Sequence, residues 1–317
     1  VTGYDVDGLI FDDYFYPNRI PEDSGASDYA LYKSEAPWMS FGDWRRASVH
    51  KAIADVRAMI SDTRPDVRFG ISPAGVAGKS DTSASKWGAE CVDVPASDWQ
   101  YNEIYSDPLG MMYQGTIDFV SPQIYWATTH ATAPYVPLAQ WWSRTANLYG
   151  RHMYASVTLE RINQGKLSDH RDDLLRQIEC NRTMSIDGNQ GTVIYSAKFL
   201  PKVCDALTSG PWTYPALTPE VTRGGVETLG VADGLRLRDG VLSWSPVKGA
   251  RRYTVYAVPD DIALRDAMDE EGDGIDPAFL LGVTYSPEME VGAEPGYRYG
   301  VCVYSGHSTE GKPAWSK

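Results

Sequence analysis

Basic residues are scarce in this sequence of 317 residues, because 29 lysines and arginines face 42 aspartates and glutamates and leave a net charge of −13. Proteins that bind nucleic acids need stripes of Lys and Arg against the phosphates, so this balance argues against a nucleic-acid partner. The sequence also lacks any run of 18 apolar residues, the length that a membrane-spanning helix requires. We therefore expect a soluble protein without a membrane span.

Cysteine is also rare, and the four residues Cys91, Cys180, Cys204 and Cys302 lie far apart. No CxxC pair and no neighbouring histidine pair accompanies them, so the sequence gives no sign of a zinc site or a redox motif. We predict buried free thiols, with a single disulfide in the first part of the chain as the alternative.

Several nucleotide-binding and hydrolase motifs are missing as well. No GxGxxG opens a predicted helix, and the segment from Ser72 to Gly78 has neither a Walker pattern nor a GxSxG elbow. The acidic segment 269–276 lacks EF-hand spacing and is predicted to be a solvated loop. We therefore predict no cofactor and no metal, and we exclude serine-dependent hydrolysis and phosphoryl transfer.

What the sequence does contain is an alternation of short apolar segments and helical patterns. Ser40 can cap a helix whose apolar residues recur at helical spacing until Arg64-Pro65. Strand, helix and strand in this order form a right-handed parallel unit. Five parallel strands are predicted within 6–11, 67–72, 117–124, 152–159 and 191–196, and further helices within 138–149, 169–184 and 197–207.

Two α/β architectures accept this pattern, an open doubly wound sheet and a closed (β/α)8 barrel of the TIM type. We favour the barrel because polar residues follow nearly every strand, which is how a barrel builds one site from many strand ends. Eight strands close such a barrel and only five are visible, so we interpret residues 1–213 as its C-terminal part. We expect the first three βα units to come from an upstream segment or from another chain.

After about residue 213 the apolar pattern changes from helical spacing to alternation. Residues 214–317 contain short strand patterns separated by turns such as Arg238-Asp239-Gly240, which is typical of a small all-β sandwich. The segment LSWSPVKGARRYTVYAV resembles a fibronectin type III domain, in which Trp244 would pack against Tyr253. We predict a second domain of this kind.

The candidate catalytic residues follow the first strand, in YDVDGLIFDDYFYP. Asp12 and Asp13 come directly after its apolar residues, at the carboxyl end where parallel α/β folds carry out chemistry. Adjacent residues point in different directions, so one acid can face the barrel mouth while the other orients it. We rank Asp13 first because it lies farther out along the chain. Asp7 lies inside the predicted strand, where burial requires that it be hydrogen-bonded.

Five motifs in order, YDVDGLIFDDYFYP, DWRRASVHKAI, RFGISPAG, DFVSPQIYW and GTVIYSAKFL, resemble the bacterial glycosyl-hydrolase-like barrel family that includes the divisome-localised enzyme of denuded peptidoglycan glycans. The likeness extends from Val1 to about Leu207. The sequence departs from the family at Leu9-Ile10, where Ile-His is usual, and at AGVAGKS, where an aromatic and a basic residue are common. The resemblance implies a barrel, glycosidase chemistry, a glycan partner, and a secreted, periplasmic or cell-surface location, where a lipid anchor could hold the protein.

Glycoside hydrolysis needs a second carboxyl group besides Asp12 or Asp13. Glu160 ends the strand YASVTLE and is the best candidate, ahead of the loop residues Asp98, Glu103 and Asp107. Polar and aromatic side chains near the strand ends suit sugar hydroxyls and rings. The predicted substrate-binding residues are Asp7, Tyr14, Ser72, Asp107, Gln123, Tyr125, Trp126 and Lys198, and weaker stacking candidates are Trp38, Trp87 and Trp99.

We therefore predict a glycoside hydrolase that cleaves a bacterial cell-wall or related polysaccharide by carboxylate acid–base chemistry. One alternative is a non-catalytic glycan-binding envelope protein, which is favoured if the candidate acids prove remote from one another. A second alternative is a structural envelope protein whose barrel is a relic, which is favoured if no cleft opens beside Asp12 and Asp13.

Overall fold

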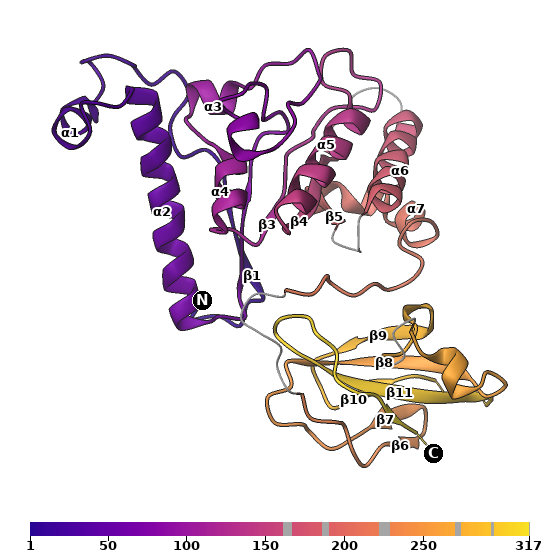
Figure 1. Ribbon diagram of the computed structural model, residues 1–317. Coiled ribbons are helices and arrows are strands. Elements are labelled where there is room, and N and C mark those ends of the chain that lie inside the picture. Colours follow the sequence, from indigo (N-terminus) through magenta and orange to yellow (C-terminus); the bar gives the residue numbers. More distant parts are fainter. Residues whose placement is uncertain (161–166, 186–189, 222–228, 270–273, 293–294, 317) are drawn as a thin grey trace. The chain divides into compact units, whose positions relative to one another are not determined.

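The computed structural model describes residues 1–160, 167–185, 190–221, 229–269, 274–292 and 295–316. The chain forms two compact units, Val1–Thr213 and Tyr214–Lys317, whose elements are labelled in Figure 1. Within the described part of the chain, no helix is long and apolar enough to cross a bilayer.

The first unit is built on a parallel five-stranded sheet in which each strand pairs with the next one along the chain. Its strands are β1 (Gly8–Asp12), β2 (Arg68–Ser72), β3 (Phe119–Val120), β4 (His152–Thr158) and β5 (Gln190–Tyr195). This sequential order fits an α/β barrel-like fold, since a doubly wound sheet reverses its order at one point. The prediction of five parallel strands is confirmed. Over the described residues, β1 and β5 do not pair with each other, so the sheet is open.

A local sequence rule accounts for the start of the longest helix, α2 (Phe41–Thr63). The hydroxyl of Ser40 accepts a hydrogen bond from the backbone N–H of Asp43 at 3.1 Å, which caps its first turn as predicted. The other helices of this unit are α1 (Tyr29–Glu35), α3 (Trp99–Glu103), α4 (Pro108–Gln114), α5 (Tyr135–Leu148), α6 (Leu167–Met184) and α7 (Cys204–Thr208), with 3₁₀ helices η1 (Ser85–Trp87) and η3 (Ala197–Lys202). The single helix predicted within 197–207 is therefore wrong, and Pro201 lies inside the 3₁₀ helix η3 that replaces its first part.

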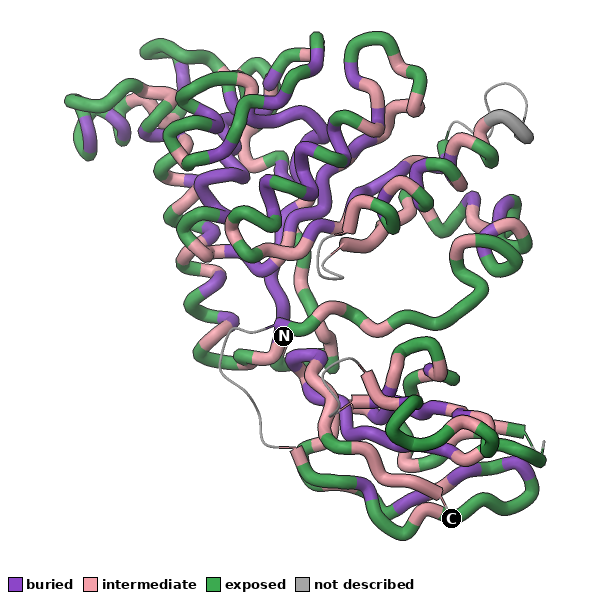
Figure 2. Tube along the Cα trace, turned by 45° about the vertical axis from the view of Figure 1, so that its right-hand side comes forward, coloured by how far each residue is buried: buried purple, intermediate pink, exposed green. Residues whose placement is uncertain are grey.

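Burial is strongest along the middle of the sheet. Strands β2 and β4 are mostly buried, whereas alternate residues of β1 are exposed. Figure 2 shows buried residues, in purple, gathered in the interior of the first unit. Strand β1 is not covered on both faces, because Ile10 is 45% exposed. The face of β1 that carries Ile10 and Asp12 lines a cleft instead of packing against another element.

The second unit contains two antiparallel sheets, with strand orders β10-β7-β6 and β12-β11-β8-β9. Its strands are β6 (Arg236–Arg238), β7 (Val241–Ser243), β8 (Arg252–Pro259), β9 (Leu280–Thr284), β10 (Glu288–Glu290), β11 (Tyr297–Tyr304) and β12 (Ala314–Trp315), with 3₁₀ helices η4 (Leu264–Ala267) and η5 (Pro277–Phe279). The rings of Trp244 and Tyr253 are both buried and 5.2 Å apart, so the predicted contact is confirmed. Strands β10 and β12 were not predicted from the sequence. Residues 270–273 of the predicted acidic loop lie outside the described residues.

The cysteines differ from expectation. All four are free thiols, so the alternative of a disulfide does not hold. Cys302 is buried as predicted, but Cys91 and Cys204 are exposed. The prediction of burial for these two is wrong because both lie outside the strands and helix faces that build the core.

Candidate active site

A cleft with a volume of about 650 Å³ lies at the carboxyl ends of the five strands of the first unit. All five strands contribute to it, with their last residues or with the residues that follow them. It is lined by Ile10, Asp12, Tyr14, Ser72, Ser121, Gln123, Tyr125, Ser156, Glu160, Val193, Ile194 and Tyr195. The side chains thus meet as expected for an α/β fold whose site is assembled from many strand ends.

Gln123 orients two cleft residues, Asp12 at the end of β1 and Tyr14 just after it. Its Nε2 donates to Asp12 Oδ1 at 2.7 Å and to the backbone carbonyl of Ser72 at 3.1 Å. Its Oε1 accepts a hydrogen bond from the hydroxyl of Tyr14 at 3.2 Å. The backbone of Gln123 forms bridges to the segment after β2 and to Ser156 in β4, so its position is fixed from both sides. Asp12 is therefore exposed to the cleft but held in one orientation.

Glu160 reaches the same cleft from the end of β4. Tyr125 also lines the cleft. Its hydroxyl is 3.3 Å from Ser156 Oγ, and its ring stacks on that of Tyr195 with the ring centres 5.8 Å apart. Burial raises the pKa of Tyr125, the hydrogen bond to Ser156 lowers it, and the negative charges of Asp12 and Glu160 raise it further. Both carboxylates therefore act on one side chain, and the structure brings these two predicted acids together.

Asp13 is placed differently from its neighbour, because it is fully buried and does not line the cleft. Consecutive residues of a strand point to opposite faces, so Asp13 turns away from the cleft that Asp12 faces. The expectation that Asp13 lies farther out towards the mouth is wrong. The hydroxyl of Ser106 donates to Asp13 Oδ2, and Oδ1 has no hydrogen-bond partner among the described residues. Burial raises the pKa of Asp13 to about 7. The hydrogen bond from Ser106 lowers this pKa, whereas the negative charges of Asp12 and Asp107 raise it further.

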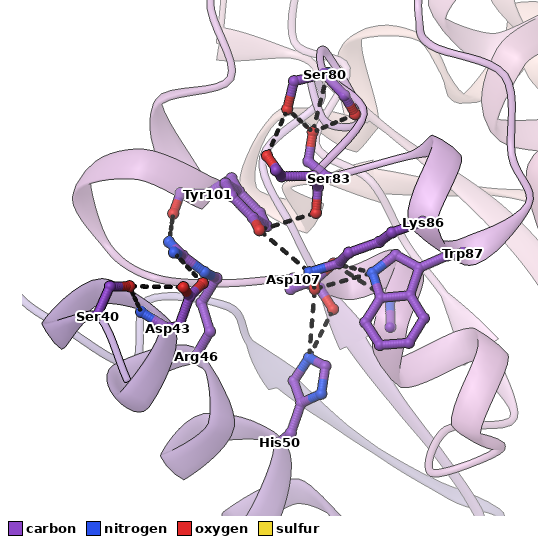
Figure 3. Close-up of polar contacts among 12 residues, drawn as sticks. Ser40, Asp43, Arg46, His50, Ser80, Ser83, Lys86, Trp87, Tyr101 and Asp107 are labelled. Carbon is purple, nitrogen blue, oxygen red and sulfur yellow. Dashed lines mark hydrogen bonds and ion pairs between the residues drawn. The ribbon is translucent and has the colours of Figure 1, made fainter. Parts of the chain in front are cut away.

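Asp107 lies in a separate cluster of polar side chains, shown in Figure 3. It caps helix α4 by accepting from the backbone N–H of Gly110 at 3.3 Å. Its carboxylate also lies 3.2 Å from Lys86 Nζ and accepts hydrogen bonds from the indole of Trp87 at 3.1 and 3.0 Å. Its backbone carbonyl lies 3.1 Å from His50 Nε2. Asp107 and Trp87 are therefore bound to each other rather than open to the cleft.

Other predicted polar residues also lie away from the cleft. Asp98 is buried at the start of α3, where it accepts from the backbone N–H of Tyr101 at 3.3 Å, and burial raises its pKa to about 6. Glu103 is exposed at the end of the same helix. Asp7 precedes β1 and thus lies at the amino end of the strand, and Lys198 is exposed on η3. None of these four side chains lines the cleft.

The tryptophans predicted to stack on sugar rings lie in different surroundings. The ring of Trp126 packs so closely over Gly75 that a Cβ there would lie 2.7 Å from it, which indicates a structural role. Trp38 is 79% exposed between α1 and α2. Trp99 does not line the cleft, but its ring lies 6.0 Å from that of Tyr14, which does.

Three polar cleft residues, Ser121, Ser156 and Tyr195, were not selected from the sequence, and neither were the apolar residues Ile10, Val193 and Ile194. Ser156 precedes Glu160 by four residues, and the alternation of a strand would have placed both on one face. Tyr195 is the last residue of β5, so its position at a strand end was the available signal. No group of His, Cys, Asp and Glu side chains suited to a metal ion occurs in the part of the chain that the structure describes.

Comparison with known proteins agrees with this geometry. The family model described as glycosyl hydrolase-like 10 matches residues 1–172. Glycosyl hydrolase YngK of Bacillus subtilis strain 168 is 31% identical over 235 residues, which cover 70% of this chain and 43% of the relative. Glycosyl hydrolase DigH of Escherichia coli K12 is 29% identical over 214 residues, which cover 64% of this chain and 46% of the relative. The chain thus spans less than half the length of either relative.

The match to the family model covers more than half of the chain and includes β1 to β4, whose ends carry both Asp12 and Glu160. The resemblance seen in the sequence is thereby confirmed, and the chain belongs to the glycosyl hydrolase-like 10 family.

Proposed function

We propose that this protein is a glycoside hydrolase that cleaves a bacterial cell-wall or related polysaccharide, with Asp12 and Glu160 as its pair of carboxyl groups. The observation that carries the proposal is that these two acids, from the ends of different strands, line one cleft of about 650 Å³. Glycoside hydrolysis requires two such groups, one protonated to release the leaving group and one ionised. The family resemblance supports the choice of glycan and an envelope or secreted location.

Asp12 suits the ionised role. Its Oδ1 accepts a hydrogen bond from the amide of Gln123, and a donor of this kind stabilises a carboxylate as it faces the developing positive charge of the sugar. Glu160 then takes the role of the proton donor. The rings of Tyr14, Tyr125 and Tyr195 supply apolar surface along the cleft for sugar rings.

The open sheet supports a further part of the proposal. Ile10 on β1 and Val193 on β5 are 45% and 42% exposed, and each lies on an outer strand of the five. We propose that additional βα units, from upstream sequence or from another chain, pair with these strands and complete the barrel around the cleft. Activity should therefore be measured on the full-length protein.

The test is an assay of new reducing ends on purified peptidoglycan glycan strands, with and without peptide stems, and on chitin oligosaccharides. We expect Asp12→Asn and Glu160→Gln each to lower turnover at least about a thousandfold, or roughly 4 kcal/mol of barrier, while glycan affinity changes little. Glu103→Gln, which alters an exposed acid outside the cleft, is the matched control and should keep the parental rate.

Two results would reject the proposal. Glycan binding without any release of reducing ends by the parent protein would favour the non-catalytic binding protein. Parental turnover in the double variant Asp12→Asn/Glu160→Gln would remove this cleft from the reaction.

A further inference from the structure

Asp13 is a buried acid without a cationic partner in the part of the chain that the structure describes. It is fully buried, and within the described residues no Lys, Arg or His lies within ion-pair distance of it. Its Oδ1 is buried without a hydrogen-bond partner there, so only Ser106 stabilises the carboxyl group. A buried carboxylate with a bare oxygen is costly, and the neutral acid is the cheaper form.

The partner of Asp13 is held by the polar cluster of Figure 3. Ser106 is fully buried, and the next residue, Asp107, is fixed by Lys86 and Trp87 and caps α4. The backbone N–H of Ser106 also donates to the carbonyl of Gln100 at 3.0 Å. The position of the Ser106 hydroxyl beneath β1 is therefore determined by the fold and not by the solvent.

The groups that face Asp13 come from several elements. Asp12 is its neighbour in the chain, Asp107 precedes α4, and both carboxylates oppose its ionisation. Tyr14 has its own pKa raised chiefly by burial and in part by Asp12 and Asp13. The backbone N–H of Asp13 donates to the carbonyl of Ser72 in β2 at 3.2 Å, so this donor is already used.

We propose that Asp13 is a positioning residue that acts through Asp12: it stays uncharged beneath the cleft while Asp12 works, and its ionisation sets the upper pH limit of the reaction. A charged Asp13 would add a like charge beside the ionised Asp12 and would draw water towards the buried Oδ1. This inference rests on the proposed function for its kinetic consequence but not for the coupling between the two acids.

The coupling is tested by ¹³C NMR of carboxyl groups in the aspartate-labelled full-length protein, with Asp12 and Asp13 assigned by substitution. In the parent, we expect the Asp13 signal to titrate near pH 7, with a second inflection of the Asp12 signal at the same pH. In Asp13→Asn, which mimics the neutral acid at every pH, this inflection should vanish. The alkaline limb of kcat/KM should move up by at least about one pH unit, a tenfold gain in relative rate on that limb.

Ser106→Ala is a second variant, for which we expect a shift of the Asp13 pKa in a defined direction. Loss of this hydrogen bond should raise the pKa of Asp13 further and shift both the inflection and the alkaline limb upward, and Ser106→Thr should restore them. An Asp13 signal that titrates below about pH 5, or an unchanged Asp12 inflection in both variants, would overturn the inference. If the parent hydrolyses no glycan but the inflection is present, the coupling stands and the proposed function fails.

Discussion

A buried acid lies at each end of the parallel sheet, and the two acids differ in their hydrogen-bond and ion-pair partners. At the amino end, Asp118 precedes β3 and is 7% exposed. It accepts hydrogen bonds from Arg57 Nη1 and Nη2 at 2.8 and 3.0 Å and from the backbone N–H of Phe69 at 2.8 Å. At the carboxyl end, the side chain of Asp13 has one hydrogen-bond partner among the described residues, the hydroxyl of Ser106. Within the described residues, the fold pairs Asp118 with a cation and leaves Asp13 beside the cleft without one.

This difference between the two acids matches the different roles of the two ends of the sheet. In α/β barrels the amino face of the sheet serves stability and the carboxyl face serves chemistry. The paired acid Asp118 joins α2 to the sheet through Arg57, whereas the unpaired acid lies next to Asp12 in the proposed active site. An acid without a cation is costly to the fold, so its place beside the cleft supports a functional role.

The largest effect on stability is expected at the amino end. Arg57→Met removes the cation from Asp118 and leaves a buried carboxylate, which should lower the free energy of unfolding by about 3–5 kcal/mol. The measurement is chemical denaturation at pH 7. Asp118→Asn in the Arg57→Met background keeps an acceptor for the N–H of Phe69 and should recover part of the loss.

Asp13→Asn is the matched change at the other end of the sheet. It removes no ion pair and should change the free energy of unfolding by less than about 1 kcal/mol near pH 5, where the parent acid is uncharged. The contrast between the two ends would be removed if Arg57→Met lowered the free energy of unfolding by less than about 1 kcal/mol. It would also be removed if Asp13→Asn lowered this free energy by more than Arg57→Met does.

A smaller effect per pH unit is expected from the titration of Asp13. Its pKa is raised to about 7 in the folded protein, above the value of an unfolded chain, so the folded state binds one more proton between about pH 4 and 7. The stability from this group is therefore complete below about pH 4 and is lost as the pH rises to 7, by up to about 1.4 kcal/mol per pH unit.

This loss is measured as the difference in unfolding free energy between the parent and Asp13→Asn from pH 4 to 8.5. The difference should fall with rising pH and become constant above about pH 8, because Asp13 is then ionised in both states. A difference that rises over the same range would show that the folded protein stabilises the charged form of Asp13.

Much of the fold could be predicted because the local signals are strong. The cap at Ser40 and the apolar pattern after it determine α2, and short apolar segments locate the five parallel strands. The pattern did not predict the 3₁₀ helix that contains Pro201 or the short strands β10 and β12 of the second unit, because spacing alone does not identify such elements.

The candidate site could be predicted only in part. Position at a strand end was enough to select Asp12, Gln123, Tyr125 and Glu160, which share the cleft. The order of Asp12 and Asp13 could not be decided from the sequence, since it depends on which face of β1 is packed. The contacts of Asp107 with Lys86 and Trp87 depend on how the segment 73–107 folds back on itself. Such contacts produce no periodic pattern in the sequence.

The most direct test of the account compares Asp12→Asn with Asp13→Asn in the full-length protein, by kcat/KM on glycan strands at pH 5.5. We predict a loss of at least about a thousandfold for Asp12→Asn and of less than about tenfold for Asp13→Asn, because only Asp12 lines the cleft and Asp13 is already uncharged at this pH. The reverse ranking, with Asp13→Asn nearly inactive and Asp12→Asn close to the parent, would contradict it.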